Sequence, residues 1–201
     1  MSFDTTAANQ QRHRFDADAR VWLFGYGSLI FKADFVYISR RPASIRDWSR
    51  RFWQGSHDHR GTPDAPGRVV TLVPDPGAIC HGMAYLITPE VFDHLDHREK
   101  NGYLRFMAPL TFEDGSGASS LVYIATKDNA AFLGPASDED IARQIAGAVG
   151  PSGRNRDYLT DLATALHALG KSDPHVLAIV DALSTEPLAP IVPSSRKPEP
   201  P

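Results

Sequence analysis

The stretch Phe24-Gly25-Tyr26-Gly27-Ser28-Leu29-Ile30 marks the point from which the rest of the fold is best understood. It follows Val21-Trp22-Leu23-Phe24, an apolar run typical of a short buried strand. Two glycines one residue apart allow the backbone to turn sharply and to expose its N–H groups, because neither carries a Cβ atom. Such a loop can bind an anion, or it can be only a tight turn.

Three common motifs do not fit this loop. A dinucleotide-binding G-x-G-x-x-G fingerprint requires glycine where the sequence has Ile30. The G-x-S-x-G elbow of serine hydrolases requires glycines two residues before and after Ser28, but Tyr26 and Ile30 occupy those positions. The lysine of a Walker phosphate loop is missing as well. The sequence therefore argues against nucleotide binding and against a serine nucleophile at this loop.

The composition predicts an ordinary soluble protein with one core. The chain has 201 residues, 42% of them apolar and 22% charged. Its formal net charge of −3 shows no excess of basic residues of the kind that binds nucleic acid. The single cysteine, Cys80, excludes an intramolecular disulfide and a cysteine-based zinc site. No run approaches the roughly 20 apolar residues of a membrane span, and residues 1–20 lack the apolar core of a signal peptide. We therefore expect a cytoplasmic location and no membrane contact.

Composition also divides the chain. Residues 1–20 are polar with no clear period, which predicts a loose N-terminal arm, and residues 186–201 contain six prolines, which predicts a flexible tail. No Gly/Ser-rich or Pro-rich linker interrupts residues 21–185, so these are expected to form one domain.

Strand-like segments occupy most of the first two thirds of this domain. The turn Pro74-Asp75-Pro76-Gly77 separates two of them, and Gly82 marks a bulge or a close backbone approach in the second. A short helix is expected after Thr88-Pro89, and three more helices follow Pro135. Strands with one short helix, followed by C-terminal helices, predict an α+β fold rather than a doubly wound parallel sheet.

Two groups of polar residues are candidates for chemistry. His57, His59, His94 and His97 offer nitrogen donors, but their spacing matches no strong zinc motif, so hydrogen-bonding or solvent-facing roles are favoured and no metal is expected. Glu99 lies in a charge run at the end of the expected short helix, which is typical of a solvated face. Alternatively, partial burial beside the glycine turn at Gly102 would raise its pKa and make it a general base.

Six short motifs, in order, resemble those of the ChaC-like γ-glutamylcyclotransferases, the glutathione-specific branch of that family. They cover about residues 21–185: 24–29 (FGYGSL), 51–56 (RFWQGS), 58–63 (DHRGTP), 66–72 (PGRVVTL), 98–100 (REK) and 150–155 (GPSGRN) with Tyr158. Asn101 stands where many relatives have glycine, whereas Gly102 and Tyr103 remain in place.

The resemblance implies a γ-glutamylcyclotransferase-like fold, which is a small mixed β-barrel with packed helices. It also implies cleavage of glutathione into 5-oxoproline and cysteinylglycine without a metal or another cofactor. Carried over by position, Glu99 is the catalytic acid/base, and the substrate-binding residues are Tyr26, Gly27, Ser28, Leu29, Arg68 and Tyr158. Two alternatives remain: a cyclotransferase for other γ-glutamyl peptides or amines, and a non-catalytic γ-glutamyl-binding or interaction protein.

Overall fold

Five strands form a closed barrel in this computed structural model, which describes residues 4–185. The barrel order is β1 (Val21–Gly25), β3 (Gly67–Ile87), β2 (Ser39–Ser56), β4 (Tyr103–Phe112) and β5 (Gly117–Ala125). Neighbouring strands are antiparallel, except that β5 pairs in parallel with β1 and so closes the barrel. The expected mixed β-barrel of an α+β protein is confirmed, whereas the expected tail at 186–201 lies outside the described residues.

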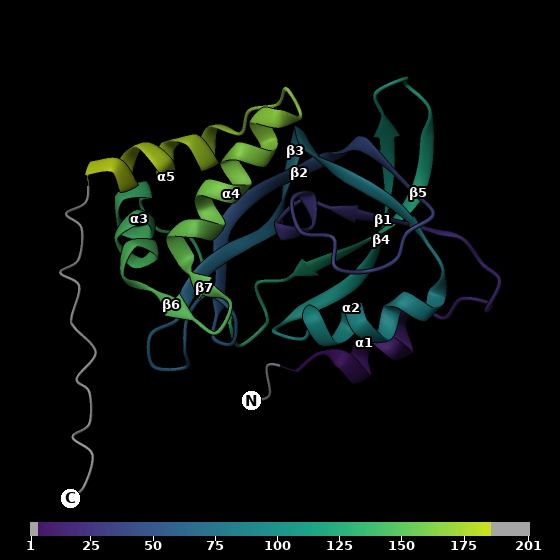
Figure 1. Cartoon of the computed structure of the whole chain (residues 1–201), viewed down its shortest axis with the longest axis horizontal. Helices are drawn as coiled ribbons and strands as arrows, with labels where there is room; N and C mark the ends of the chain where they lie inside the picture. The colour runs from purple at the N-terminus through teal and green to yellow at the C-terminus, as the bar shows by residue number, and fades with distance from the viewer. Residues whose placement is uncertain (1–3, 186–201) are drawn as a thin grey trace, which may run out of the picture.

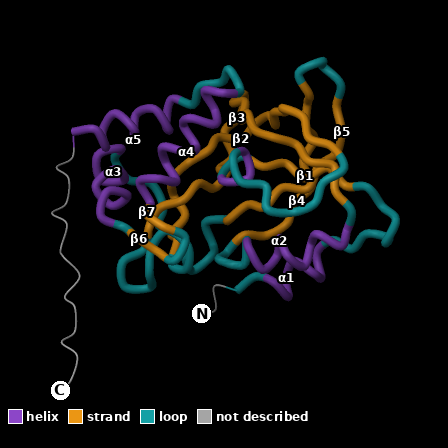
Figure 2. The backbone as a smooth tube through the Cα atoms, in the orientation of Figure 1, coloured by secondary structure: helices purple, strands orange, loops and turns teal. Residues whose placement is uncertain are grey.

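The helices gather at two places on the barrel (Figure 1). At one end, α3 (Asp138–Gly147), α4 (Asn155–Ala168) and α5 (Pro174–Thr185) pack on one another and on the long β2–β3 hairpin. Elsewhere α1 (Thr6–Arg12) lies beside α2 (Phe92–Arg98), below the strands in Figure 2. The shorter elements are the 3₁₀ turns η1 (Ser28–Ile30) and η2 (Pro89–Val91) and the two-residue strands β6 (Val149–Gly150) and β7 (Gly153–Arg154). The C-terminal helices that the sequence predicts are present.

Strand β1 is buried on both faces, which explains its continuous apolar run. Phe24 belongs to the larger core cluster, which β1 shares with the C-terminal helices, whereas Leu23 belongs to a second cluster beside α2. Successive side chains of a strand point to opposite faces, so a strand between two cores has no polar face. Because β1 is fixed from both sides, the loop that follows it is held in place.

The predicted turn at Pro74-Asp75-Pro76-Gly77 is an irregularity within one strand and does not reverse the chain. Trp48 of β2 pairs with Pro74, and Arg46 pairs with Ile79, so the extra residues of β3 bulge opposite Asp47. The Asp47 carboxylate accepts a hydrogen bond from the N–H of Gly77 at 2.8 Å. Local turn chemistry located the interruption, but β3 pairs with β2 on both sides of the bulge, so the strand keeps its direction.

The N-terminal segment differs from the expected loose arm, because part of it forms α1 and is anchored to β4. Asn9 is fully buried; its amide donates to the carbonyl of Tyr103 and accepts from the N–H of Arg105, both at 2.9 Å. One polar side chain thus binds two backbone groups of β4. The spacing of apolar residues in the sequence cannot predict such a contact, because the residue that makes it is polar.

Candidate active site

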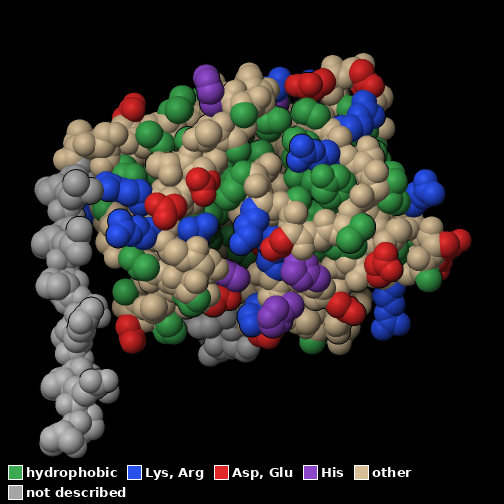
Figure 3. All heavy atoms as spheres, viewed as in Figure 1, with side chains coloured by type: hydrophobic (Ala, Val, Ile, Leu, Met, Phe, Trp, Pro, Cys, Tyr) green, Lys and Arg blue, Asp and Glu red, His purple; other side chains and the backbone are tan. Residues whose placement is uncertain are grey.

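A cavity opens between the loop after β1, the end of α2, the loop after β2 and the start of α4. The face of the molecule in Figure 3 carries acidic, basic and histidine side chains together near its centre. Six of the seven residues that the sequence assigned to the site line this cavity: Tyr26, Gly27, Ser28, Leu29, Glu99 and Tyr158. The fold therefore brings together a loop and a carboxylate that are far apart in the sequence.

Internal donors fix the loop at residues 26–29. Arg50 of β2 is 1% exposed, and its Nε donates to the carbonyl of Tyr26 at 2.6 Å, while its other nitrogens donate to the carbonyl of His81 and to Asp173. The hydroxyl of Tyr85 donates to the carbonyl of Leu29, also at 2.6 Å. Both ends of the loop are thus tied to the barrel through their carbonyl groups, which holds the loop beside the cavity.

Close packing explains why position 27 is glycine. Its φ is −120°, so no left-handed conformation is required here. A Cβ atom on Gly27 would instead lie 2.9 Å from the hydroxyl oxygen of Tyr158 and 2.9 Å from Cγ2 of Val70. The glycine allows the backbone to approach α4 and β3, and this approach shapes the cavity wall.

Glu99 directly follows α2, and its side chain lines the cavity. Its N–H donates to the carbonyl of Leu95 at 2.8 Å, which completes the last turn of the helix, and its side chain is 16% exposed. Nε of Arg98 lies 3.3 Å from its carboxylate. Burial raises the pKa of Glu99, while the positive charges of Arg98 and His59 oppose that rise. The carboxylate is thus partly buried at the cavity, so the interpretation as a solvated face is wrong for this residue.

Three tyrosines form the inner wall of the cavity. Tyr26 donates to the carbonyl of Tyr123, and Tyr103 donates to the carbonyl of Val70, both at 2.7 Å. Tyr158 accepts from the N–H of Val70 at 3.5 Å, and none of the described residues accepts its proton. Burial raises the pKa of Tyr158 to about 12, so its hydroxyl keeps its proton and remains a donor toward the cavity.

Arg68 is the predicted site residue that does not line the cavity. Its guanidinium donates to Gln144 at 2.7 Å and to the carbonyls of Phe52 and Gly134 at 2.9 and 3.0 Å. All these partners belong to the protein, and they join β3 to α3 and to the segment before it. In this structure Arg68 therefore contacts other parts of the protein and not the cavity, so its assignment as a substrate-binding residue stays a prediction.

The cavity lining also contains residues to which the sequence assigned no role in the site. Asp58, His59 and Arg60 lie in the loop after β2, and Ser152 lies between β6 and β7. Nδ1 of His59 lies 3.0 Å from Oγ of Ser152, which joins these two loops. These residues belong to the motifs at residues 58–63 and 150–155, which marked the family resemblance but did not indicate what the side chains do. Within residues 4–185, no three His, Cys, Asp or Glu side chains gather in a way that could hold a metal ion.

Comparison with known proteins agrees with this architecture. The chain is 48% identical over 168 residues to gamma-glutamylcyclotransferase 2-3 of Arabidopsis thaliana, covering 78% of this chain and 84% of that protein. It is 40% identical over 191 residues to human glutathione-specific gamma-glutamylcyclotransferase 1, covering 90% of this chain and 86% of the human protein. The crystal structure of the yeast γ-glutamyl cyclotransferase specific to glutathione superposes with a TM-score of 0.78 at 32% identity, covering 83% of this chain and 96% of that one.

The family assignment rests on a match across the whole described barrel and its C-terminal helices. The model of the ChaC-like protein family matches residues 21–186, from the first residue of β1 to just beyond α5. No helix within residues 4–185 is both long and apolar enough to cross a membrane. With its closed barrel, its cavity and this match, the chain belongs to the ChaC-like protein family.

Proposed function

We propose that this chain is a glutathione-specific γ-glutamylcyclotransferase that releases 5-oxoproline and cysteinylglycine. The observation that carries the proposal is the shared cavity of the 26–29 loop and the partly buried carboxylate of Glu99. The names of the human and Arabidopsis relatives support the reaction class, and the names of the human and yeast relatives support glutathione as the substrate.

The reaction needs a folded substrate and a single proton carrier. The α-amine of a γ-glutamyl group reaches its own γ-carbonyl in a five-membered ring, so the protein gains most by holding that conformation. Ionised Glu99 takes a proton from the α-ammonium group, and the freed nitrogen attacks the γ-carbonyl carbon. When the bond to the cysteinyl nitrogen breaks, Glu99 returns this proton to that nitrogen. Glu99 then carries the second proton from the ring nitrogen to the freed amine, which leaves as an ammonium group while 5-oxoproline keeps a neutral ring N–H, so atoms and charge balance and no cofactor is needed.

The remaining cavity residues suit the charges of this substrate. Backbone N–H groups of Gly27, Ser28 and Leu29 are the donors for the α-carboxylate or for the oxyanion that forms at the γ-carbonyl. The cavity wall also carries both signs of charge, as expected for a ligand with one ammonium and two carboxylate groups. The basic members are Lys32, Arg60 and Arg98, and the acidic members are Asp34, Asp58 and Glu99.

A substrate panel tests the proposal. Purified protein is incubated separately with reduced glutathione, oxidised glutathione, γ-glutamyl-alanine and γ-glutamyl-lysine, and 5-oxoproline and the leaving amine are measured. We expect turnover of reduced glutathione in preference to the other compounds. Preference for another member of the panel would support a cyclotransferase of different specificity, and binding of glutathione without product would support a non-catalytic protein.

Substitution of Glu99 by glutamine tests the proton carrier. Glu99→Gln keeps the size of the side chain but removes its basicity, so we expect kcat to fall by about 10²–10⁴-fold with the fold intact. Glu139→Gln is the matched control, because Glu139 is exposed on the first turn of α3, away from the cavity. A folded Glu99→Gln protein with the turnover of the Glu139→Gln protein would contradict the assignment.

A further inference from the structure

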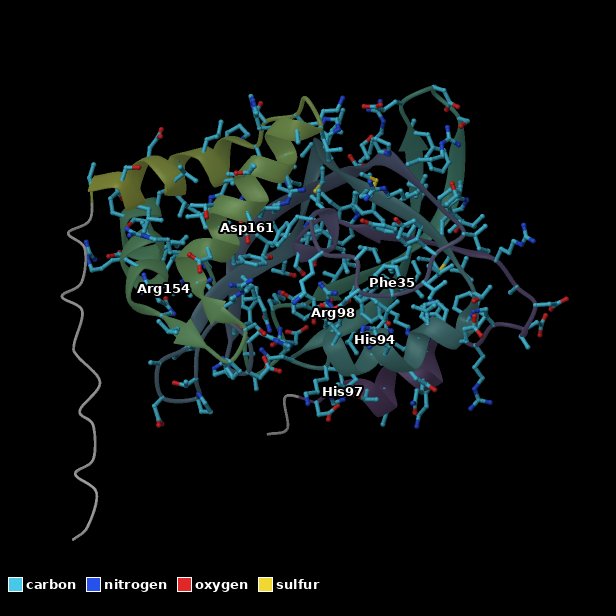
Figure 4. The ribbon with its side chains drawn as sticks, viewed as in Figure 1. Phe35, His94, His97, Arg98, Arg154 and Asp161 are labelled. Atoms are coloured by element: carbon cyan, nitrogen blue, oxygen red, sulfur yellow. The ribbon has the colours of Figure 1, made fainter. Side chains whose placement is uncertain are left out.

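Arg98 joins three neighbouring segments of the cavity wall: the 26–29 loop, the segment at residues 32–34 and Glu99. One terminal nitrogen donates to Oγ of Ser28 at 2.8 Å; the other donates to the carbonyl of Lys32 at 3.1 Å and to the carboxylate of Asp34. Its Nε lies 3.3 Å from the carboxylate of Glu99. Figure 4 shows Arg98 at the end of α2, on the same helix as His94, whose ring nitrogen lies 3.3 Å from Asp34.

The planar shape of the guanidinium makes these contacts depend on one another. Its nitrogens are fixed in a rigid fork, so binding two of them determines where the third lies. In Arg98 the two terminal nitrogens are held by the 26–29 loop and by the segment at residues 32–34, and the third, Nε, lies 3.3 Å from the carboxylate of Glu99. The side chain is 13% exposed, so little solvent competes for these contacts. Lysine, a point charge on a flexible stem, does not reproduce this fork.

We propose that Arg98 is a positioning residue that fixes the Glu99 carboxylate relative to the 26–29 loop, and that Asp34 holds Arg98 in that orientation. The inference rests on the proposed function, because it concerns the same proton transfer. Arg98 itself carries no proton in the reaction. It fixes the distance between the Glu99 carboxylate and the 26–29 loop, and its positive charge acts on that carboxylate.

Charges from several elements act on Glu99. Arg98 lies beside it on α2, His59 and Asp58 face it from the loop after β2, and Asp34 faces it from the loop after η1. The hydroxyls of Tyr26, Tyr103 and Tyr158 complete the surroundings. Burial raises the pKa of Glu99, Arg98 and His59 lower it, and Asp34 and Asp58 raise it further. Because the base must be ionised to accept a proton, the activity rises with pH through this pKa.

The two partners of the pair therefore have opposite expected effects on the pH profile. Arg98→Gln removes a cation, which raises the pKa of Glu99 and moves the acidic limb of the kcat–pH profile to higher pH. Asp34→Asn removes an anion, which moves that limb to lower pH. Arg98→Lys keeps the charge but loses the fork, so the limb stays near its wild-type position while kcat falls.

The experiment measures kcat and KM for reduced glutathione across the acidic and neutral range, with folding checked by circular dichroism. We expect kcat to fall more than KM rises in Arg98→Gln, with a loss of up to about 10²-fold, because a misplacement of roughly 1 Å at a reacting group can cost that much. Arg41→Gln is the matched control: Arg41 also pairs with an aspartate, Asp114, at 2.6 Å, and does not line the cavity.

Failure of the inference and failure of the proposed function give different results. If wild-type protein releases no 5-oxoproline, the proposed function is wrong, and the inference falls with it. If wild-type protein is active and Arg98→Gln shows the same kcat and the same acidic limb as wild type, the inference alone is overturned. Should Arg98→Gln fail to fold, Asp34→Asn decides the question. Asp34 is 38% exposed, so this variant is expected to fold, and the acidic limb of its kcat–pH profile must lie at lower pH than that of wild type.

Discussion

Replacing Gly27 by alanine adds one methyl group where the structure has no room for it. The new Cβ would lie 2.9 Å from the hydroxyl oxygen of Tyr158 and 2.9 Å from Cγ2 of Val70. Carbon atoms pack best at about 3.5–4.0 Å, so the contact with Val70 is too short by at least ~0.6 Å. Tyr158 and Val70 are 6% and 2% exposed and are held by their own packing, so the loop must move instead.

Two magnitudes follow from this displacement. Overpacking of this kind costs about 1–3 kcal/mol, and each kcal/mol lowers the melting temperature of a chain of this size by about 2–4 °C. A displacement of about 1 Å can cost 10²-fold in rate, so a shift of several tenths of an ångström predicts a loss of kcat/KM of roughly 10–100-fold. Release of 5-oxoproline from glutathione and a thermal melt measure the two effects separately.

Gly147→Ala is the matched control. A Cβ atom at Gly147, the last residue of α3, would meet nothing within 4 Å. We expect unchanged kcat/KM and a stability equal to wild type or higher by up to about 1 kcal/mol, because alanine restricts the unfolded chain. If Gly27→Ala is as active as Gly147→Ala, close approach is not the reason for glycine in the loop.

Three further predictions concern stability. Arg68→Met should lower the free energy of unfolding by about 1–3 kcal/mol, because it leaves buried carbonyl acceptors unpaired, while the folded protein keeps the wild-type KM for glutathione. A raised KM would indicate that Arg68 binds the substrate. Asp96→Asn should cost about 3–5 kcal/mol in chemical denaturation, because Arg105, 2.7 Å from Asp96 and 4% exposed, would keep a buried unpaired charge; a change below that range would mean that solvent reaches the pair. Because burial raises the pKa of Glu99 above its usual 4.5, wild-type protein should lose stability relative to Glu99→Gln as pH rises through that raised pKa, and melts at acidic pH should converge. Melts that diverge as the pH falls would contradict the raised pKa.

Local signals in the sequence predicted many elements correctly. A helix is present after Pro135, as expected: Ser137 caps α3 by accepting a hydrogen bond from the N–H of Asp140 at 3.1 Å. Gly82 marks a close approach, because its Cβ would lie 2.2 Å from the carbonyl oxygen of Gly25. Such signals act between residues that are near in sequence, or they reflect the size of a single residue, so one sequence is enough to detect them.

Other features depend on partners that are distant in the sequence. Arg68 and Arg98 are both arginines in short family-like motifs, yet one is satisfied by the protein interior and the other faces the cavity. Asn9 is a polar residue in a polar segment, and it is buried because it binds the carbonyl of Tyr103 and the N–H of Arg105 in β4. The direction in which a long polar side chain points depends on the tertiary fold.

The sequence by itself determined the α+β class and the glycine loop, because residue type and spacing carry that information, whereas it singled out Glu99 only through the resemblance to the ChaC-like family. Only the tertiary structure decided that the loop and Glu99 share one cavity, since closure of the barrel by β1 and β5 brings distant segments together. It also decided that Arg98 joins them, because its guanidinium meets Ser28 and Glu99 at once only in the folded chain.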